Sequence, residues 1–371
     1  MTDQSLKKIR VEGFTSIRSA TVELGKLNIL VGANGAGKSN FVHALELLGR
    51  IVEGELGLFV GLNGGALALL NTEASQIHLE LEGESNSYAA TLSPAVNDEL
   101  IFKSEVMYFH AEGYERPYNE VLGQGHRETH LPAEAKRRPG RIAAHVTSLL
   151  KGCKVFHFHD TSADAPVKRL VPTVDNLSLR NDAGNLAAYL FRLQNSDVPA
   201  EQSAYRRILG AIRLVAPFFR DFALEPDSHD RILLRWRQQD SDAVFSANQM
   251  SDGTLRFVCL ATLLLQPELP RLVVLDEPEL GLHPFAIVQL AGLLRQASQR
   301  SQVLIATQSV TLMNQFEVGD LIVVERKAGF SDFTRPDLSA LEDWLKEYSL
   351  GELWEKNLLG GRPAREETGN A

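Results

Sequence analysis

Hydrophobic and polar positions change their spacing several times along this 371-residue chain. Residues 8–14 and 19–24 alternate apolar and polar side chains, as half-buried antiparallel strands do. Residues 27–31 form a short apolar run. After residue 38 apolar side chains recur at helical spacing up to Gly49, which we expect to end a helix. The chain is therefore predicted to begin with strands and one amphipathic helix.

The middle of the chain has a less regular pattern. Alternation over residues 76–110 predicts a β meander. Residues 111–142 are rich in Gly, Pro, His and Arg, and we expect them to form an irregular surface excursion. Helical spacing returns at residues 142–152 and 183–221. This part is predicted to be a compact, largely helical insertion.

The last third has the clearest pattern. Apolar runs at residues 271–275, 302–306 and 321–324 alternate with segments of helical spacing at residues 252–265 and 284–299. Strands that are apolar throughout are buried on both faces, so this alternation predicts parallel strands covered by helices. The expected fold class is therefore α/β, with a mixed sheet, an antiparallel β subdomain and a helical insertion.

Composition and charge narrow the class of protein. Hydrophobic residues make up 44% and charged residues 23% of the chain, as in soluble globular proteins. A net charge of −9 argues against a generally basic coat for nucleic acid. Cys153 and Cys259 lack metal-ligand spacing, which favours a reducing compartment. Because no apolar leader or membrane-length run is present, we expect a cytoplasmic protein with no membrane partner.

Residues 32–39 match the complete pattern G-x-x-x-x-G-K-[ST] of a phosphate-binding loop. They follow an apolar run and precede a helix, which is the context that this loop requires. The glycines let backbone N–H groups face a polyphosphate, and the helix N-terminus adds partial positive charge. Lys38 is expected to reach the β- and γ-phosphates, and Ser39 to bind Mg²⁺. The residues predicted to contact the nucleotide are Asn34, Gly35, Ala36, Gly37, Lys38, Ser39 and Asn40.

Two acidic residues, Asp276 and Glu277, follow the apolar run at residues 272–275. The carboxyl ends of parallel strands open on the ligand crevice of an α/β sheet. We expect Asp276 to hold Mg²⁺ and Glu277 to act as the general base on the attacking water. Alone, two acids at a strand end are more often solvated carboxylates. Together with the phosphate loop, they predict hydrolysis of a nucleoside triphosphate.

Three further motifs make the sequence resemble a known family. Residues 250–256, with their S-x-G core, resemble the signature motif of ABC-type ATPases. Residues 279–284 resemble the D-loop of those proteins, in the E-x-G-L-H-P form typical of RecF-, SMC- and OLD-like ATPases. Residues 306–309 resemble the switch loop. The whole chain is similar to stand-alone bacterial ATPases of the AAA_21 group, which implies the fold of an ABC-type P-loop NTPase.

The resemblance implies ATP as substrate, Mg²⁺ as cofactor, and ADP and phosphate as products. It also implies that Ser251 and Gly253 cap a γ-phosphate held by a second copy of the chain, so that ATP drives formation of a homodimer. The switch position, usually His, is Gln308 here, which cannot titrate near neutral pH. We therefore expect slow hydrolysis. His159 and Asp160 remain equal candidates for the residue that senses Mg²⁺ in the first lobe.

The motifs divide the chain into four expected parts. Residues 1–110 and 236–337 form the ATPase domain, residues 111–235 an insertion, and residues 338–371 a C-terminal helical tail. The insertion carries the densest basic cluster of the chain, which is either a contact for the DNA backbone or an ordinary solvated loop. The members of this basic cluster are Arg127, Lys136, Arg137, Arg138 and Arg141.

Two biological roles agree with the resemblance. The first is a RecF-like ATPase of DNA repair, including double-strand break repair, or of DNA maintenance. The second is an ATPase sensor or scaffold of an anti-phage defence system that controls a separate effector nuclease. Too few residues follow residue 326 for the nuclease domain of OLD-type proteins, so we expect that this chain does not cut DNA itself. The form of the D-loop argues against a transporter subunit.

Overall fold

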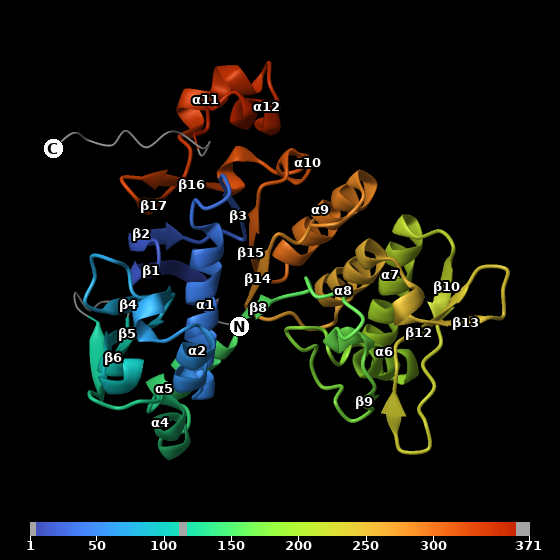
Figure 1. Cartoon of the computed structure of the whole chain (residues 1–371), viewed down its shortest axis with the longest axis horizontal. Coiled ribbons are helices and arrows are strands. Elements are labelled where there is room, and N and C mark those ends of the chain that lie inside the picture. The colour runs from blue at the N-terminus through green and yellow to red at the C-terminus, as the bar shows by residue number, and fades with distance from the viewer. Residues whose placement is uncertain (1–4, 111–116, 361–371) are drawn as a thin grey trace.

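The structure is a computed structural model that describes residues 5–110 and 117–360. The first residues of the predicted insertion and the last eleven of the predicted tail, residues 361–371, therefore lie outside the described part. A central sheet separates an antiparallel sheet on one side from a group of helices on the other (Figure 1). This arrangement places two hydrophobic cores on the two faces of one sheet.

The central sheet has the strand order β17-β16-β3-β15-β14-β8. Strands β16, β3, β15, β14 and β8 run parallel, and β17 lies antiparallel at one edge. The apolar runs predicted as parallel strands thus lie side by side although they come from distant parts of the sequence. The strands are β3 (Leu27–Val31), β8 (Cys153–Phe156), β14 (Leu272–Asp276), β15 (Gln302–Thr307), β16 (Leu321–Lys327) and β17 (Phe330–Thr334).

Successive residues of the central strands enter different cores, because side chains alternate between the faces of a sheet. Leu30 and Val274 pack with the antiparallel sheet and α1 (Lys38–Glu53), whereas Ile29 packs on the opposite face. That second core includes α8 (Asp252–Leu265) and α9 (Pro284–Ser298). All five residues of β3 are buried, which explains why four of them are apolar. The fifth, Asn28, donates hydrogen bonds to the carbonyl oxygens of Gly25 and Val303.

The antiparallel sheet has the order β2-β1-β4-β5-β6-β7 and includes the predicted meander. Residues 111–142 were expected to be irregular, but their described part contains a strand and a helix. The strand pairs with the edge of β6, and buried Leu131 anchors the helix, α4 (Leu131–Arg137). The strands are β1 (Leu6–Phe14), β2 (Ile17–Glu23), β4 (Ile77–Gly83), β5 (Asn86–Pro94), β6 (Leu100–Phe109) and β7 (Tyr118–Gly123).

Helix α1 is longer than the sequence suggested, because Gly49 does not end it. Ile51 and Val52 continue its buried face beyond that glycine, so the helix keeps its packing for one more turn. Gly54 ends it instead, with a left-handed φ of 76° that a residue with a side chain rarely adopts. The prediction of Gly49 as the stop was therefore wrong.

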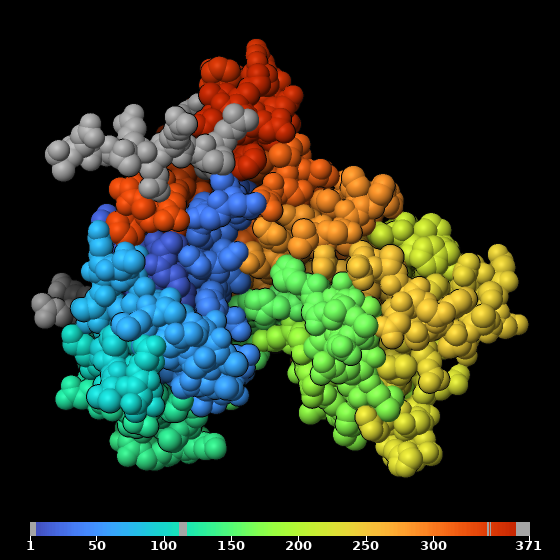
Figure 2. All heavy atoms as spheres, viewed as in Figure 1, coloured from blue at the N-terminus to red at the C-terminus, as the bar shows by residue number. Residues whose placement is uncertain are grey.

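The remaining helices form a helical lobe and peripheral cover. Helix α7 packs on α8 and α9, and α6 packs on α7. Figure 2 shows a deep notch between this green-to-yellow lobe and the blue-to-cyan antiparallel part. Two small sheets, β10-β12-β13 and β11-β9, flank the lobe. The described residues include no helix that is long and apolar enough to cross a membrane.

The helices not yet named are α2 (Leu56–Leu62), α3 (Ala66–Leu69), α5 (Ile142–Lys151), α6 (Leu186–Asn195), α7 (Pro199–Val215), α10 (Val310–Met313), α11 (Leu338–Leu345) and α12 (Leu350–Glu355). The short strands are β9 (Val171–Pro172), β10 (Phe219–Phe222), β11 (Arg231–Ile232), β12 (Arg235–Gln238) and β13 (Val244–Ser246).

Candidate active site

The phosphate loop connects the carboxyl end of β3 to the first turn of α1, at the edge of the central sheet. Two of its glycines are fixed by close packing. A Cβ atom on Gly32 would lie 2.3 Å from the Val324 carbonyl oxygen, and one on Gly37 would lie 1.9 Å from Ser331 Oγ. Gly37 also has a φ of 111°, which favours glycine. The loop therefore takes its shape from contact with β16 and β17 as well as from its own sequence.

Lys38 turns its side chain back into this loop. Its Nζ donates hydrogen bonds to the carbonyl oxygens of Gly32, at 2.8 Å, and Ala33, at 3.1 Å, and only 5% of the residue is exposed. Burial lowers the pKa of Lys38, while the negative charges of Glu277 and Asp276 oppose that shift. The lysine predicted to bind phosphate therefore lies near both the predicted Mg²⁺ ligand, Asp276, and the predicted general base, Glu277.

The first turn of α1 can receive a phosphate. Gly37 is the N-cap of this helix, and within residues 5–110 and 117–360 no side chain caps its first N–H groups. Ser39 is exposed, so its hydroxyl is accessible as a metal ligand. Asn40 is placed differently, because its Nδ2 donates to Ser16 Oγ at 2.7 Å, which leaves its backbone N–H as the group for a phosphate. Asn34, Gly35 and Ala36 lie in the loop itself, the first two of them exposed.

Asp276 and Glu277 end β14 in an environment suited to a cation. Asp276 Oδ1 is buried and has no hydrogen-bond partner among the described residues. A buried carboxylate oxygen is costly unless a cation or a donor reaches it, which fits the expected Mg²⁺ ligand. Glu277 has a φ of 40°, rare for a residue other than glycine, and its N–H donates to the Ala306 carbonyl oxygen at 2.8 Å. Such a conformation costs about 1–3 kcal/mol and is concentrated at functional sites.

The signature residues begin α8 at the surface. Ser251 is the exposed N-cap of the helix, and its Oγ accepts a hydrogen bond from the Thr254 N–H at 3.3 Å. A Cβ atom on Gly253 would lie 2.6 Å from the Gly281 carbonyl oxygen, so the first turn of α8 packs directly on the D-loop. Among the described residues, the hydrogen bonds of the Ser251 hydroxyl go to Thr254 in its own helix and not to the phosphate loop. The exposure of Ser251 agrees with a role toward a second copy.

The structure separates the two candidates for the metal-sensing residue. His159 follows β8, which pairs in parallel with β14, so it leaves the sheet at the same edge as Asp276. Burial lowers the pKa of His159, and the charge of Asp276 opposes this shift. Asp160 instead accepts a hydrogen bond from the Ser162 N–H at 3.0 Å and closes a local turn. His159 is therefore the better placed of the two, although its role remains a prediction. Gln308 follows β15 and is exposed at the same edge of the sheet.

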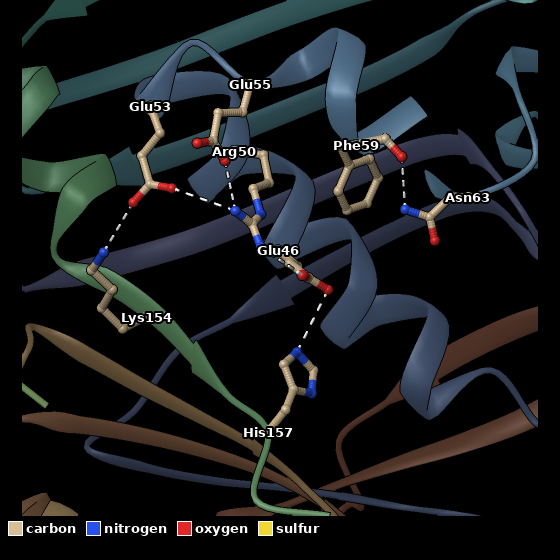
Figure 3. A network of polar contacts seen from close by, with 8 residues as sticks. All are labelled: Glu46, Arg50, Glu53, Glu55, Phe59, Asn63, Lys154 and His157. Carbon is tan, nitrogen blue, oxygen red and sulfur yellow. Dashed lines mark hydrogen bonds and ion pairs between the residues drawn. The ribbon is translucent and has the colours of Figure 1, made fainter. Parts of the chain in front are cut away.

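Polar contacts tie the later part of α1 to β8 and the segment that follows it (Figure 3). Glu46 pairs with His157 at 3.5 Å, and Glu53 pairs with Lys154 at 3.2 Å. The hydrogen bond from His157 lowers the pKa of Glu46. A cavity of about 640 Å³ lies beside these contacts, between α1 and residues 178–182 of the helical lobe. The helix that follows the phosphate loop is thereby linked to the segment that carries His159.

Arg256 is a functional candidate that sequence reasoning missed. It lies in the signature helix, is 7% exposed, and donates to the carbonyl oxygens of Phe158 and His159 at 3.0 Å each and to that of Leu280. Burial lowers the pKa of Arg256. In the sequence, a role for Arg256 was indicated by its position in the signature motif. Its contacts were not, because His159 and Phe158 lie 97 and 98 residues away along the chain. Arg256 joins the signature helix, the end of β8 and the D-loop.

We expect Arg256→Met to lower the free energy of unfolding by about 3 kcal/mol, because each hydrogen bond from a charged group contributes about 1.5–3 kcal/mol. Methionine preserves most of the buried stem but leaves three carbonyl groups without this donor. Urea denaturation measures the loss. The matched control is Arg206→Met on the exposed face of α7, which should change stability by less than about 0.5 kcal/mol. Equal losses in the two variants would contradict this account of Arg256.

The basic cluster is largely paired with acidic residues. Arg138 contacts carboxylates from two segments, Arg127 pairs with a carboxylate that precedes β6, and the third pair lies within α4. Such pairing reduces the local positive charge available for a phosphate backbone. Lys136 and Arg141 are exposed. The ion pairs are Arg127 with Glu99 at 3.3 Å, Arg137 with Glu134 at 2.7 Å, and Arg138 with Glu120 at 3.3 Å.

The phosphate loop between β3 and α1, on a parallel sheet covered by helices, gives the chain the architecture of a P-loop NTPase, and solved structures show the same fold. One is an Smc head domain bound to the C-winged helix domain of ScpA, with 16% identity and a TM-score of 0.54, covering 91% of this chain and 99% of that one. Another is an Smc head domain with an extended coiled coil, bound to the C-terminal domain of ScpA derived from Pyrococcus furiosus. It has 15% identity and a TM-score of 0.52, covering 92% of this chain and 99% of that one.

The chain belongs to the AAA_21 family, described as "AAA domain, putative AbiEii toxin, Type IV TA system", whose model matches residues 27–314. No curated protein matches the sequence. The expected family resemblance and the expected α/β fold class are therefore confirmed. Membership of this family implies nucleotide binding with a divalent metal ion. The four domain boundaries and the roles of individual residues stay predictions.

Proposed function

We propose that this chain is a Mg²⁺-dependent ATPase in which two copies close on ATP. The observation that carries the proposal is the convergence of Lys38 with Asp276 and Glu277 at one edge of the central sheet. The buried lysine provides a positive charge, the buried oxygen of Asp276 lacks a partner in the described chain, and Glu277 provides a base. This is the donor set needed to bind and hydrolyse a nucleoside triphosphate.

Each residue has a distinct task in hydrolysis. Backbone N–H groups of the phosphate loop and the ammonium of Lys38 bind the β- and γ-phosphates. Ser39 and Asp276 would hold Mg²⁺, which would supply a Lewis acid that neutralises phosphate charge. Glu277 accepts a proton from the attacking water, and Gln308 donates a hydrogen bond to a γ-phosphate oxygen.

A second copy completes the site in this proposal. Ser251 and Gly253 begin α8 at the surface, where its N–H groups and the Ser251 hydroxyl can approach a phosphate from outside. The phosphate that they cap belongs to the ATP of the second copy. ATP binding therefore favours the dimer. Hydrolysis removes the γ-phosphate and with it this contact, so the two copies separate.

Of the two biological roles, we favour a sensor ATPase that acts on a partner protein, such as the effector nuclease of a defence system. Support comes from the basic cluster, because three of its five members are paired with carboxylates. The family description, which includes a toxin–antitoxin system, agrees with this role. RecF-like DNA repair or maintenance is the second candidate, and it depends on Lys136 and Arg141 as exposed phosphate contacts.

Steady-state ATP hydrolysis, measured with and without duplex DNA at low and moderate salt, tests both parts of the proposal. We expect Mg²⁺-dependent phosphate release that DNA changes by less than about twofold, because the paired cluster offers few free charges to a backbone. Hydrolysis that fails with folded protein and saturating Mg-ATP would overturn the ATPase proposal. Stimulation by DNA that weakens as salt increases would overturn the sensor role in favour of a DNA-acting ATPase.

A further inference from the structure

Glu279 is a buried carboxylate beside the proposed catalytic residues, and the mechanism above gives it no task. It lies in the D-loop, three residues after Asp276, and is 7% exposed. Its Oε1 accepts a hydrogen bond from the Thr307 hydroxyl. Its Oε2 is buried and has no hydrogen-bond partner within the described ranges. Burial raises the pKa of Glu279, and the hydrogen bond from Thr307 opposes that shift.

A carboxylate at this place is costly for the folded protein. Asp276 and Glu277 are close in sequence and carry the same charge, and the charge of Glu277 also raises the pKa of Glu279. Lys38 is the cation that interacts with all three carboxylates. A neutral side chain would avoid the desolvation cost of a third charge, so stability alone does not explain Glu279. The hydrogen bond between Glu279 and Thr307, at the edge of the sheet, gives a more specific explanation for a carboxylate at this position.

The contact joins two loops just beyond the place where their strands stop pairing. Strands β14 and β15 are in register up to Asp276 and Ala306, and the Glu277 N–H donates to the Ala306 carbonyl oxygen. Past this point the D-loop leaves the sheet, whereas Thr307 is the last residue of β15 and still pairs with Val31 of β3. The Thr307 hydroxyl bridges the D-loop and the switch loop, since it donates to Glu279 and accepts from the Ser309 N–H at 2.9 Å. Gln308 lies between the two residues of the switch loop that take part in this bridge.

We propose that Glu279 is a positioning residue for hydrolysis, which through Thr307 holds the switch loop with Gln308 in place relative to Glu277. The inference rests on the proposed function, in which Glu277 accepts the proton of the attacking water and Gln308 donates a hydrogen bond to the γ-phosphate. Lys38 and the phosphate loop do not take part in the bridge, so ATP binding does not depend on it. Loss of the bridge therefore slows the chemical step and leaves affinity for ATP largely unchanged.

Two variants remove the bridge from its two ends. Glu279→Met, which has no oxygen to accept the Thr307 hydroxyl, and Thr307→Val, which has no hydroxyl, are each expected to lower kcat about tenfold. Small misplacement of reacting groups slows reactions by up to about a hundredfold. The Kd for a fluorescent ATP analogue should stay within about twofold of the original, because the phosphate loop is untouched. The double variant should be as slow as either single variant, because both changes remove one shared interaction. Thr307→Ser keeps the hydroxyl and should retain the original kcat.

Thr262→Val is the matched control. Thr262 is also fully buried and its hydroxyl donates to the Val258 carbonyl oxygen at 2.8 Å, but it lies within α8 away from the two loops. It should leave kcat unchanged. If Glu279→Met does not fold, the comparison of Thr307→Val with Thr307→Ser decides the question by itself.

The outcomes separate this inference from the proposed function. An unchanged kcat in Thr307→Val, equal slowing by Thr307→Ser, or losses that multiply in the double variant would overturn the positioning role while the original protein still hydrolyses ATP. Absence of hydrolysis by the original protein would overturn the proposed function, and this inference with it.

Discussion

Replacing Glu277 with glutamine is expected to slow ATP hydrolysis about 10²–10⁴-fold, the usual contribution of a general base. Glutamine has nearly the same size, so the backbone hydrogen bond to Ala306 and the left-handed φ of 40° are preserved. It cannot accept the proton of the attacking water. Lys38 and the phosphate loop are unchanged, so ATP still binds. Phosphate release and titration with a fluorescent ATP analogue measure the two effects separately.

Glu268→Gln is the matched control for this prediction. Glu268 is exposed beside the cavity at α1, away from the edge of the sheet that carries Asp276 and Glu277. It should hydrolyse ATP at the original rate. A Glu277→Gln protein that keeps more than about a tenth of the original kcat would show that another group accepts the proton, because a lost general base costs more than that.

Replacing Lys38 with methionine is expected to weaken ATP binding by about 10²–10³-fold. Lys38 is buried, and its ammonium has already lost most of its hydration in the loop, where two carbonyl groups accept its hydrogen bonds. Charge-assisted hydrogen bonds to phosphate contribute about 1.5–3 kcal/mol each, and a factor of ten in Kd corresponds to about 1.4 kcal/mol. Methionine keeps the length of the side chain but none of this interaction.

Fluorescence titration or calorimetry with Mg-ATP measures the loss of affinity in Lys38→Met. Lys26→Met is the matched control, because Lys26 is exposed at the amino end of β3, opposite the phosphate loop. The control should bind ATP with the original affinity. If Lys38→Met bound ATP within about threefold of the original Kd, less than about 1 kcal/mol, the lysine would not be a phosphate ligand.

The sequence predicted the parts of the site that are local in the chain. The phosphate loop is one continuous pattern, and Asp276 ends a continuous apolar run. Their meeting also followed from the sequence, because the carboxyl ends of parallel strands share one edge of a sheet. The structure agrees, since the pKa of Lys38 responds to the charges of Glu277 and Asp276.

Features that depend on distant backbone groups were not predictable in the same way. Arg256 stood in a recognised motif, but its carbonyl partners in Phe158 and His159 are set by the packing of α8 on β8. The bridge between Glu279 and Thr307 depends on the register of β14 and β15, which no local pattern specifies. The ion pairs of the basic cluster were not predictable for the same reason, because Glu99 and Glu120 reach it from other parts of the chain.

The central claim is that ATP brings two copies together. Light scattering of the Glu277→Gln protein, with and without saturating Mg-ATP, tests this claim most directly because the variant holds ATP without consuming it. One copy has a mass of 41.0 kDa. We predict this mass without nucleotide and about twice this mass with Mg-ATP, since two composite sites form per dimer. A mass that is the same under both conditions, although ATP is shown to be bound, would contradict the account.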